Sequence, residues 1–133
     1  MINTISCFAI RLSRVELIHL LVITLLQVDN LSIGFGDSAP VIDNVSFSVN
    51  AGETLAIVGE SGSGNTLSCR AVLRILPRTA QIRAGSILFN RPDRALDLCS
   101  LPERKMRDVR GGAISMIFQE PMRSLSPLHR IGN

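Results

Sequence analysis

The sequence predicts an α/β fold with a parallel core sheet, and three observations support this prediction. Segment 55–58 is continuously apolar, as a strand buried on both faces is, and segment 113–118 is apolar apart from Ser115. The first of these segments leads into a glycine-rich turn. From Thr66 onward apolar residues recur at helical spacing, as far as Pro77, where a helix is expected to stop. Strand, turn and helix therefore follow one another in the order typical of an α/β unit.

Further elements are expected on either side of this unit. A strand is expected at 26–33, then a turn at 34–40 and a strand at 41–49. Alternation along the second strand predicts that one face is shared by Val41, Asp43, Val45, Phe47 and Val49. After the helix, a strand is expected at 86–89. A short helix is expected to begin at Pro102, because proline is favourable in a first helical turn.

The glycine-rich turn fits the phosphate-binding pattern Gly-x-x-x-x-Gly-Lys-Ser/Thr, with Asn65 in place of the lysine. In such a loop, backbone N–H groups and the helix N-terminus bind phosphates, and the hydroxyl of Thr66 would hold Mg²⁺. The predicted phosphate-binding residues are Gly59, Glu60, Ser61, Gly62, Ser63, Gly64, Asn65 and Thr66. Without its lysine the pattern also describes an ordinary glycine-rich turn, but the flanking strand and helix favour a nucleotide site.

A second motif, Phe118-Gln119-Glu-Pro-Met-Arg-Ser-Leu-Ser-Pro127, follows segment 113–118. Together with the run from Gly52 to Gly64, it resembles the ATP-binding subunits of ABC transporters, in the branch that imports oligopeptides, dipeptides and nickel. The resemblance implies a P-loop NTPase domain with an antiparallel β subdomain and a parallel core sheet, here unfinished. It divides the chain into an apolar extension at 1–24 and a partial nucleotide-binding domain at 25–133.

The resemblance implies ATP and Mg²⁺ as cofactors and adds two site residues. Gln119 would approach Mg²⁺ and the attacking water, which makes it the catalytic candidate and, with Thr66, a metal ligand. Phe35 stands where the family places an aromatic residue that stacks on adenine, although an aromatic residue at a strand end more often serves packing. The implied partners are transporter membrane subunits, contacted through the Gln119 loop, and a second ATP-binding subunit. The implied location is cytoplasmic, peripheral on the inner face of the cell membrane.

The departures from the family pattern bear on activity. Asn65 replaces a cation by a neutral amide, so binding should weaken by roughly 1.5–3 kcal/mol. Hydrolysis should be weakened more than binding, because phosphoryl transfer relies on stabilisation of the charge on the γ-phosphoryl oxygens. The family's Leu-Ser-Gly-Gly-Gln signature and its apolar strand ending in Asp-Glu do not occur in the 133 residues. We therefore expect a chain truncated after the Gln119 loop, with open strand edges and poor stability of its own.

Three functions are compatible with these features. The first is the ATP-binding subunit of a peptide-type ABC importer, represented by its N-terminal part. The second is a non-catalytic fragment that binds nucleotide weakly or only contacts membrane subunits. The third is another phosphate-loop enzyme, such as a small-molecule kinase, but this alternative does not explain the motif from Phe118 to Pro127. Whether the chain is itself an ATPase stays open.

Composition excludes several other classes. The net charge of +3 is carried almost entirely by arginines, but the chain has no tyrosine or tryptophan to stack on bases, so nucleic acid is not an expected partner. Three cysteines without a C-x-x-C pair argue against a disulfide framework. The apolar run at 18–26 follows arginines as a signal peptide would, yet it has no small-residue cleavage site and is too short to span a membrane.

Overall fold

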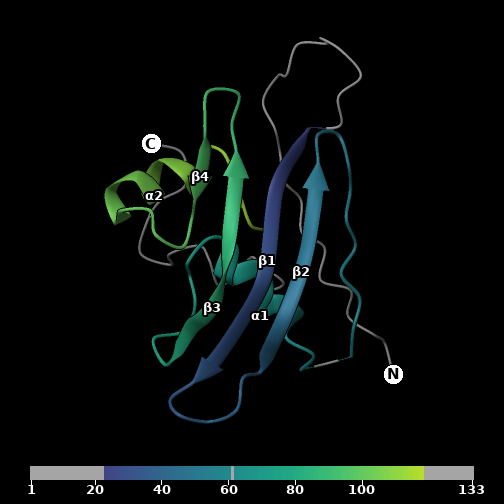
Figure 1. Cartoon of the computed structure of the whole chain (residues 1–133), viewed down its shortest axis with the longest axis vertical. Coiled ribbons are helices and arrows are strands. Elements are labelled where there is room, and N and C mark those ends of the chain that lie inside the picture. Colours follow the sequence, from purple (N-terminus) through teal and green to yellow (C-terminus); the bar gives the residue numbers. More distant parts are fainter. Residues whose placement is uncertain (1–22, 61, 119–133) are drawn as a thin grey trace, which may run out of the picture.

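A computed structural model of the chain describes residues 23–60 and 62–118. In chain order its elements are β1 (Thr24–Phe35), β2 (Ile42–Asn50), α1 (Asn65–Val72), β3 (Ala80–Asn90), β4 (Ala95–Asp97) and α2 (Glu103–Val109). The strands pair in one antiparallel sheet in the order β2-β1-β3-β4. Figure 1 shows α1 behind the sheet and α2 beside β4.

The strand β1 forms the centre of the core. It pairs with β2 on one side and β3 on the other, and Leu26, Val28, Leu31 and Ile33 are each 1% exposed or less. The same apolar cluster includes side chains of both helices, such as Val72 of α1. Because complete burial of one such side chain contributes about 1.5–3 kcal/mol, β1 supplies a large part of the favourable burial energy.

The pairing of β1 with β3 is irregular at Gly85. Gly85 has a φ of +96°, and the pairing register of β1 shifts opposite it, between Asp29 and Ser32. A Cβ at position 85 would lie 2.6 Å from the carbonyl oxygen of Asp29 and 2.7 Å from that of Asn30. Only glycine allows the two backbones to approach this closely at that φ.

Four predicted elements are confirmed, and their bounds differ from those expected. β1 and β3 include the strands expected at 26–33 and 86–89, β2 matches the strand expected at 41–49 except at Val41, and α2 follows Pro102 as expected. The strand β4 was not expected, since it is only three residues long and lies in a polar stretch. The helix α1 ends at Val72, before the expected end near Pro77, because Arg74 adopts a left-handed conformation with a φ of +52°.

The predicted face of β2 is wrong for Val41 and Val45. They are exposed, at 48% and 36%, whereas Ile42 is buried at 3%. Asn44 has a φ of +53°, so the regular alternation is interrupted inside the strand. Beyond this interruption Phe47 and Val49, which belong to the predicted face, both contribute to the core.

The expected parallel strands at 55–58 and 113–118 do not form in the described part of the chain. No backbone hydrogen bond there pairs residues 54–58 with another segment. Residue Ile114 makes only an isolated bridge to Arg110, and 115–118 are not in a strand. Strands need a hydrogen-bonded neighbour, and none lies beside these segments among the described residues. They therefore leave Val58 and Ile117 exposed, at 78% and 71%.

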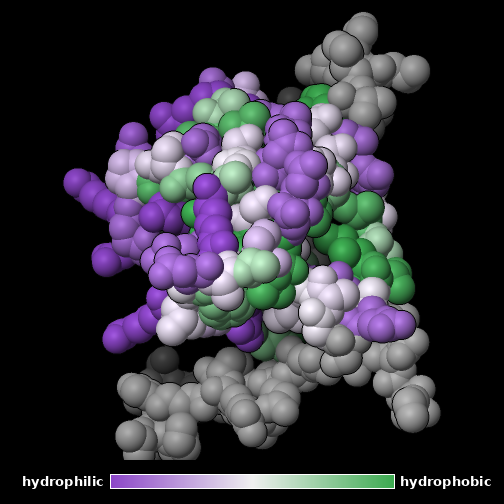
Figure 2. Space-filling model, turned by 60° about the horizontal axis from the view of Figure 1, so that its bottom comes forward, coloured by the Kyte–Doolittle hydropathy of each residue, from purple (hydrophilic) through white to green (hydrophobic). Residues whose placement is uncertain are grey.

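Hydrophobic surface is unevenly distributed. Figure 2 shows apolar residues, in green, on the side where β2 lies, whereas polar residues cover the side of α2. The large exposed hydrophobic residues are Ile23, Val41, Val45, Val58, Ile117 and Phe118. Charged residues on α2, including Lys105, account for part of the polar side.

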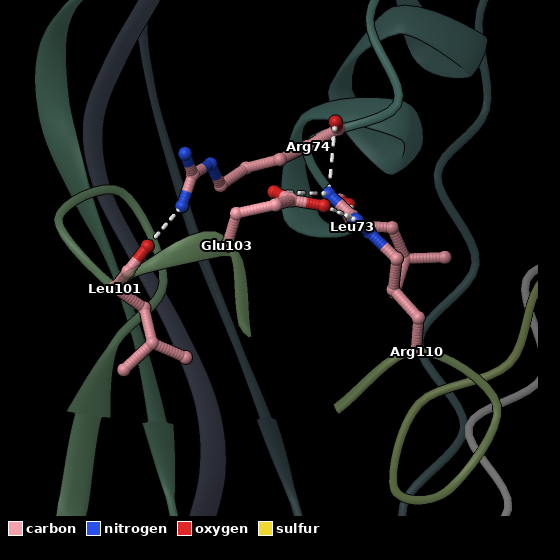
Figure 3. Close-up of polar contacts among 5 residues, drawn as sticks. All are labelled: Leu73, Arg74, Leu101, Glu103 and Arg110. Carbon is pink, nitrogen blue, oxygen red and sulfur yellow. Dashed lines mark hydrogen bonds and ion pairs between the residues drawn. The ribbon is translucent and has the colours of Figure 1, made fainter. Parts of the chain in front are cut away.

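A polar cluster ties the end of α1 to α2 (Figure 3). The guanidinium of Arg110 donates to the carbonyl oxygens of Leu73 at 2.7 Å and Arg74 at 3.3 Å. The same group pairs with both carboxylate oxygens of Glu103, at 2.5 and 3.4 Å. The guanidinium of Arg74 in turn donates to the carbonyl oxygen of Leu101. A cation at the C-terminus of a helix satisfies its last carbonyl groups and complements its dipole, so Arg110 fixes the end of α1.

The close approach at Gly85 can be tested by Gly85→Ala. We expect a loss of about 3 kcal/mol or more in the free energy of unfolding, since backbone strain and steric overlap each cost roughly 1–3 kcal/mol. Gly111→Ala is the matched control, because Gly111 also has a positive φ of +80° but an added Cβ there meets nothing within 4 Å. Urea denaturation of both variants measures the difference, and equal losses would contradict the role assigned to Gly85.

The ion pair of Glu103 predicts a dependence of stability on pH. The hydrogen bond from Arg110 lowers the pKa of Glu103 below its ordinary value. A carboxylate with a lowered folded-state pKa stabilises the fold above its unfolded pKa, about 4.3, and this contribution is lost as pH falls through the folded-state pKa. The urea midpoint of the wild-type chain should therefore exceed that of Glu103→Gln at pH 7, and this difference should shrink as pH falls below the unfolded pKa of about 4.3.

Asp108→Asn is the control for this measurement, since Asp108 lies on the same helix but outside the cluster. Its midpoint should follow that of the wild-type chain over the whole range. A difference between the wild-type chain and Glu103→Gln that does not change with pH would show that the ion pair is not the cause.

Candidate phosphate-binding site

The glycine-rich loop lies between segment 53–60 and the N-terminus of α1. The backbone N–H of Ser63 donates to the carbonyl oxygen of Glu60 at 3.0 Å, which closes a turn. Gly62 and Gly64 both have positive φ, at +88° and +90°. Such a backbone favours glycine at both positions, so the glycine spacing in the sequence has a conformational cause. Ser61, a further predicted loop residue, lies outside the described residues.

Gly64 is the N-cap of α1, and it leaves the first backbone N–H groups of this helix available as donors. The carbonyl oxygen of Gly64 accepts from the backbone N–H of Ser68 at 2.9 Å and from its hydroxyl at 3.2 Å. No side chain caps the helix, and its first turn contains no acidic residue. The first backbone N–H groups of a helix have no acceptor within it, and they carry the positive end of the helix dipole. This end of α1 is therefore suited to bind an anion such as a phosphate.

The loop is folded tightly around Gly59. A Cβ at position 59 would lie 2.4 Å from the hydroxyl oxygen of Ser63 and 3.0 Å from the side-chain nitrogen of Asn65. Both side chains therefore turn back toward the start of the loop. A Cβ at position 59 would displace these side chains, so glycine at this position allows the observed arrangement.

The loop contacts the sheet through Ile42. A Cβ at Gly64 would lie 2.8 Å from the side chain of Ile42, which pairs with Ile33 of β1. Nothing in the sequence pattern identified Ile42 as a residue that positions the loop, because the expected alternation grouped its neighbours Val41 and Asp43 on one face and left Ile42 out of it.

Phe35 lies at the same end and on the same face of the sheet as the loop. It follows Ile33 by two residues, so both side chains point to one face, which is also the face of Ile42. Gly34, between them, faces the opposite side, where a Cβ would meet the guanidinium of Arg83 at 2.4 Å. Phe35 is partly buried and packs against the core, so the structure supports its packing role directly.

The charges around the loop are few. Glu60 is exposed and carries the one charge among the described loop residues, while Asn65 is neutral. Thr66 is exposed in the first turn of α1. The described residues contain no group of three His, Cys, Asp or Glu side chains that could hold a metal ion. Gln119, the predicted catalytic residue and metal ligand, lies outside the described residues.

The arrangement fits the phosphates of a nucleotide through its backbone. The donors at the N-terminus of α1 and the two positive-φ glycines suit an anion, and the hydroxyl of Thr66 is accessible. The described loop supplies no cation to balance the phosphate charge. Phosphate binding here would therefore depend on neutral N–H donors and the helix dipole.

Known proteins resemble this chain over most of its length. The chain is 47% identical over 111 residues to the peptidoglycan transport ATP-binding protein YejF of Agrobacterium fabrum, covering 80% of this chain and 20% of that protein. It is 45% identical to the glutathione import ATP-binding protein GsiA of Pectobacterium atrosepticum, covering 80% of this chain and 18% of that protein. It is 43% identical to the oligopeptide transport ATP-binding protein OppD of Bacillus subtilis, covering 81% of this chain and 30% of that protein.

The chain thus spans less than a third of the length of these relatives. In the described part of the chain, no helix has both the length and the apolar character needed to cross a membrane. A model of the ABC transporter family matches residues 42–132, which include the loop, α1 and the motif that begins at Phe118. Given this match and the loop geometry, the chain belongs to the ABC transporter family.

Proposed function

We propose that this chain is part of the ATP-binding subunit of a peptide-type ABC importer and binds Mg-ATP at residues 59–66. The observation that carries the proposal is the loop itself. Its two positive-φ glycines lead into an uncapped helix N-terminus, within a region that matches the family. Relatives named for the transport of peptidoglycan, glutathione and oligopeptides support an importer of peptide-like compounds.

The adenine ring would stack on Phe35. Phe35 shares a sheet face with Ile33 and with Ile42, the residue that meets the loop at Gly64, and this position supports the role without excluding packing. Stacking of a base on an aromatic side chain contributes about 1–3 kcal/mol. The nucleotide would then lie across the end of the sheet, with its phosphates at Gly64 and its base at Phe35.

The remaining roles concern metal, water and partners. The hydroxyl of Thr66 would hold Mg²⁺, and Gln119 would orient the attacking water and approach the same ion. The loop that carries Gln119 would contact the membrane subunits, so that the chain acts at the inner face of the cell membrane. A second ATP-binding subunit would complete the working assembly. Bound ATP supplies the phosphoryl group whose transfer to water drives transport in such an assembly.

Binding without hydrolysis is the second candidate function. It is favoured by Asn65, because a neutral amide in the described loop cannot stabilise the charge that develops on the transferred phosphoryl group. Steady release of phosphate from Mg-ATP by the isolated chain would contradict this candidate. Nucleotide binding is common to both candidates and is therefore tested first.

Gly59→Ala tests nucleotide binding at the loop. Since the added Cβ would displace Ser63 and Asn65, we expect affinity for Mg-ATP to fall about tenfold or more, which equals a loss of about 1.4 kcal/mol. Equilibrium dialysis of the full chain with Mg-ATP measures the dissociation constant. Gly52→Ala is the control, because an added Cβ at Gly52 meets nothing within 4 Å and the residue lies outside the loop.

Circular dichroism and urea unfolding of each variant establish that the chains compared are folded. The control should bind Mg-ATP as the wild-type chain does. If the folded wild-type chain does not bind Mg-ATP, or if both variants lose affinity equally, the proposed site is wrong.

A further inference from the structure

We propose that this site binds nucleoside diphosphates and triphosphates with nearly equal affinity, and that Asn65 is the residue responsible. The inference rests on the proposed function, since it concerns the same loop. A phosphate loop distinguishes the triphosphate where a lysine reaches the β- and γ-phosphates, while backbone N–H groups hold the phosphates that both nucleotides share. The present loop keeps the backbone donors and lacks the lysine.

The first argument is the reach of the side chain at position 65. Covalent bonds of about 1.5 Å place a lysine ammonium nitrogen roughly 6 Å from its Cα, but the amide nitrogen of an asparagine only about 3.5 Å from its Cα. The side-chain nitrogen of Asn65 also turns back into the loop, where it would lie 3.0 Å from a Cβ on Gly59. The amide is thus held beside the start of the loop and does not extend to where a terminal phosphate would lie.

The second argument is that the described residues of the loop carry no cation that could replace the lysine. Arg70 lies in the last turn of α1, and Arg110 binds the carbonyl oxygens at that end. A helix of eight residues is about 12 Å long, so Arg110 lies at the end of α1 opposite to the loop. Arg83 lies on the opposite face of the sheet, and Lys105 belongs to α2.

The third argument is the charge that the loop does carry. Glu60 is exposed on the loop, and repulsion between its carboxylate and the nucleotide increases with the number of phosphates. The additional charge of a third phosphate therefore meets a carboxylate and no cation within the described part of the loop. The helix dipole and the backbone donors act on the phosphates nearest to Gly64, which both nucleotides possess.

Asn65→Lys tests this assignment against the wild-type chain. Titration calorimetry of the full chain with Mg-ADP and with Mg-ATP should give wild-type dissociation constants within about threefold of each other. A hydrogen bond to a charged group contributes a factor of roughly ten to one hundred in affinity. In Asn65→Lys we therefore expect the affinity for Mg-ATP to rise at least tenfold more than the affinity for Mg-ADP.

Asn65→Gln is the matched control, since it lengthens the side chain by one methylene and keeps it neutral. The affinities for Mg-ADP and Mg-ATP should stay within about threefold of each other in this variant, because glutamine lacks the charge of a lysine as well as part of its length. Urea unfolding shows that each variant is folded before its affinities are compared.

The outcomes separate this inference from the proposed function. If the wild-type chain binds Mg-ATP at least tenfold more tightly than Mg-ADP, the inference is overturned and the nucleotide site stands. If Asn65→Lys binds both nucleotides and the wild-type chain binds neither, backbone donors are insufficient and the inference is again overturned. If neither nucleotide binds to either folded chain, the proposed function itself is wrong.

Discussion

The pairing of β1 with both of its neighbours is the constraint on which the rest of the structure depends. Its buried side chains supply the centre of the core, and its pairing with β2 places Ile42 opposite Ile33. Ile42 in turn meets Gly64, so the position of the phosphate loop follows from a strand pairing more than twenty residues earlier in the chain. On the other side, Gly85 lets β3 follow the irregular backbone of β1. A change that moved β1 would therefore move the core and the loop together.

Local patterns predicted the helix after Pro102 and the strands around 26–33, 41–49 and 86–89, because apolar spacing and proline positions report directly on such elements. The failures have a common cause. An alternating pattern does not reveal a positive φ at Asn44 or Arg74, and each of these changed which residues were buried or where a helix ended.

The two apolar segments at 55–58 and 113–118 illustrate a different limit. Their composition is that of strands buried on both faces, and this is a property of a complete sheet. Among the described residues no neighbour pairs with them, so the same side chains are exposed, including Val58 and Ile117. Composition thus identified these segments as suited to form buried strands. Whether they form strands depends on contacts with residues distant in sequence, and composition carries no information about such contacts.

In the candidate site, the shape of the loop and the charge that it carries have separate causes. Glycine spacing predicted the loop, and the positive φ of Gly62 and Gly64 explains why the spacing matters. The proximity of Phe35 could not be predicted, since it depends on strand register. The shape of the loop rests on glycine conformation, one turn hydrogen bond and contact with Ile42, and none of these needs a charge at position 65. A neutral Asn65 is therefore compatible with an intact phosphate-binding backbone. What the neutral residue weakens is the charge-dependent steps, which are recognition of a terminal phosphate and transfer of that phosphate.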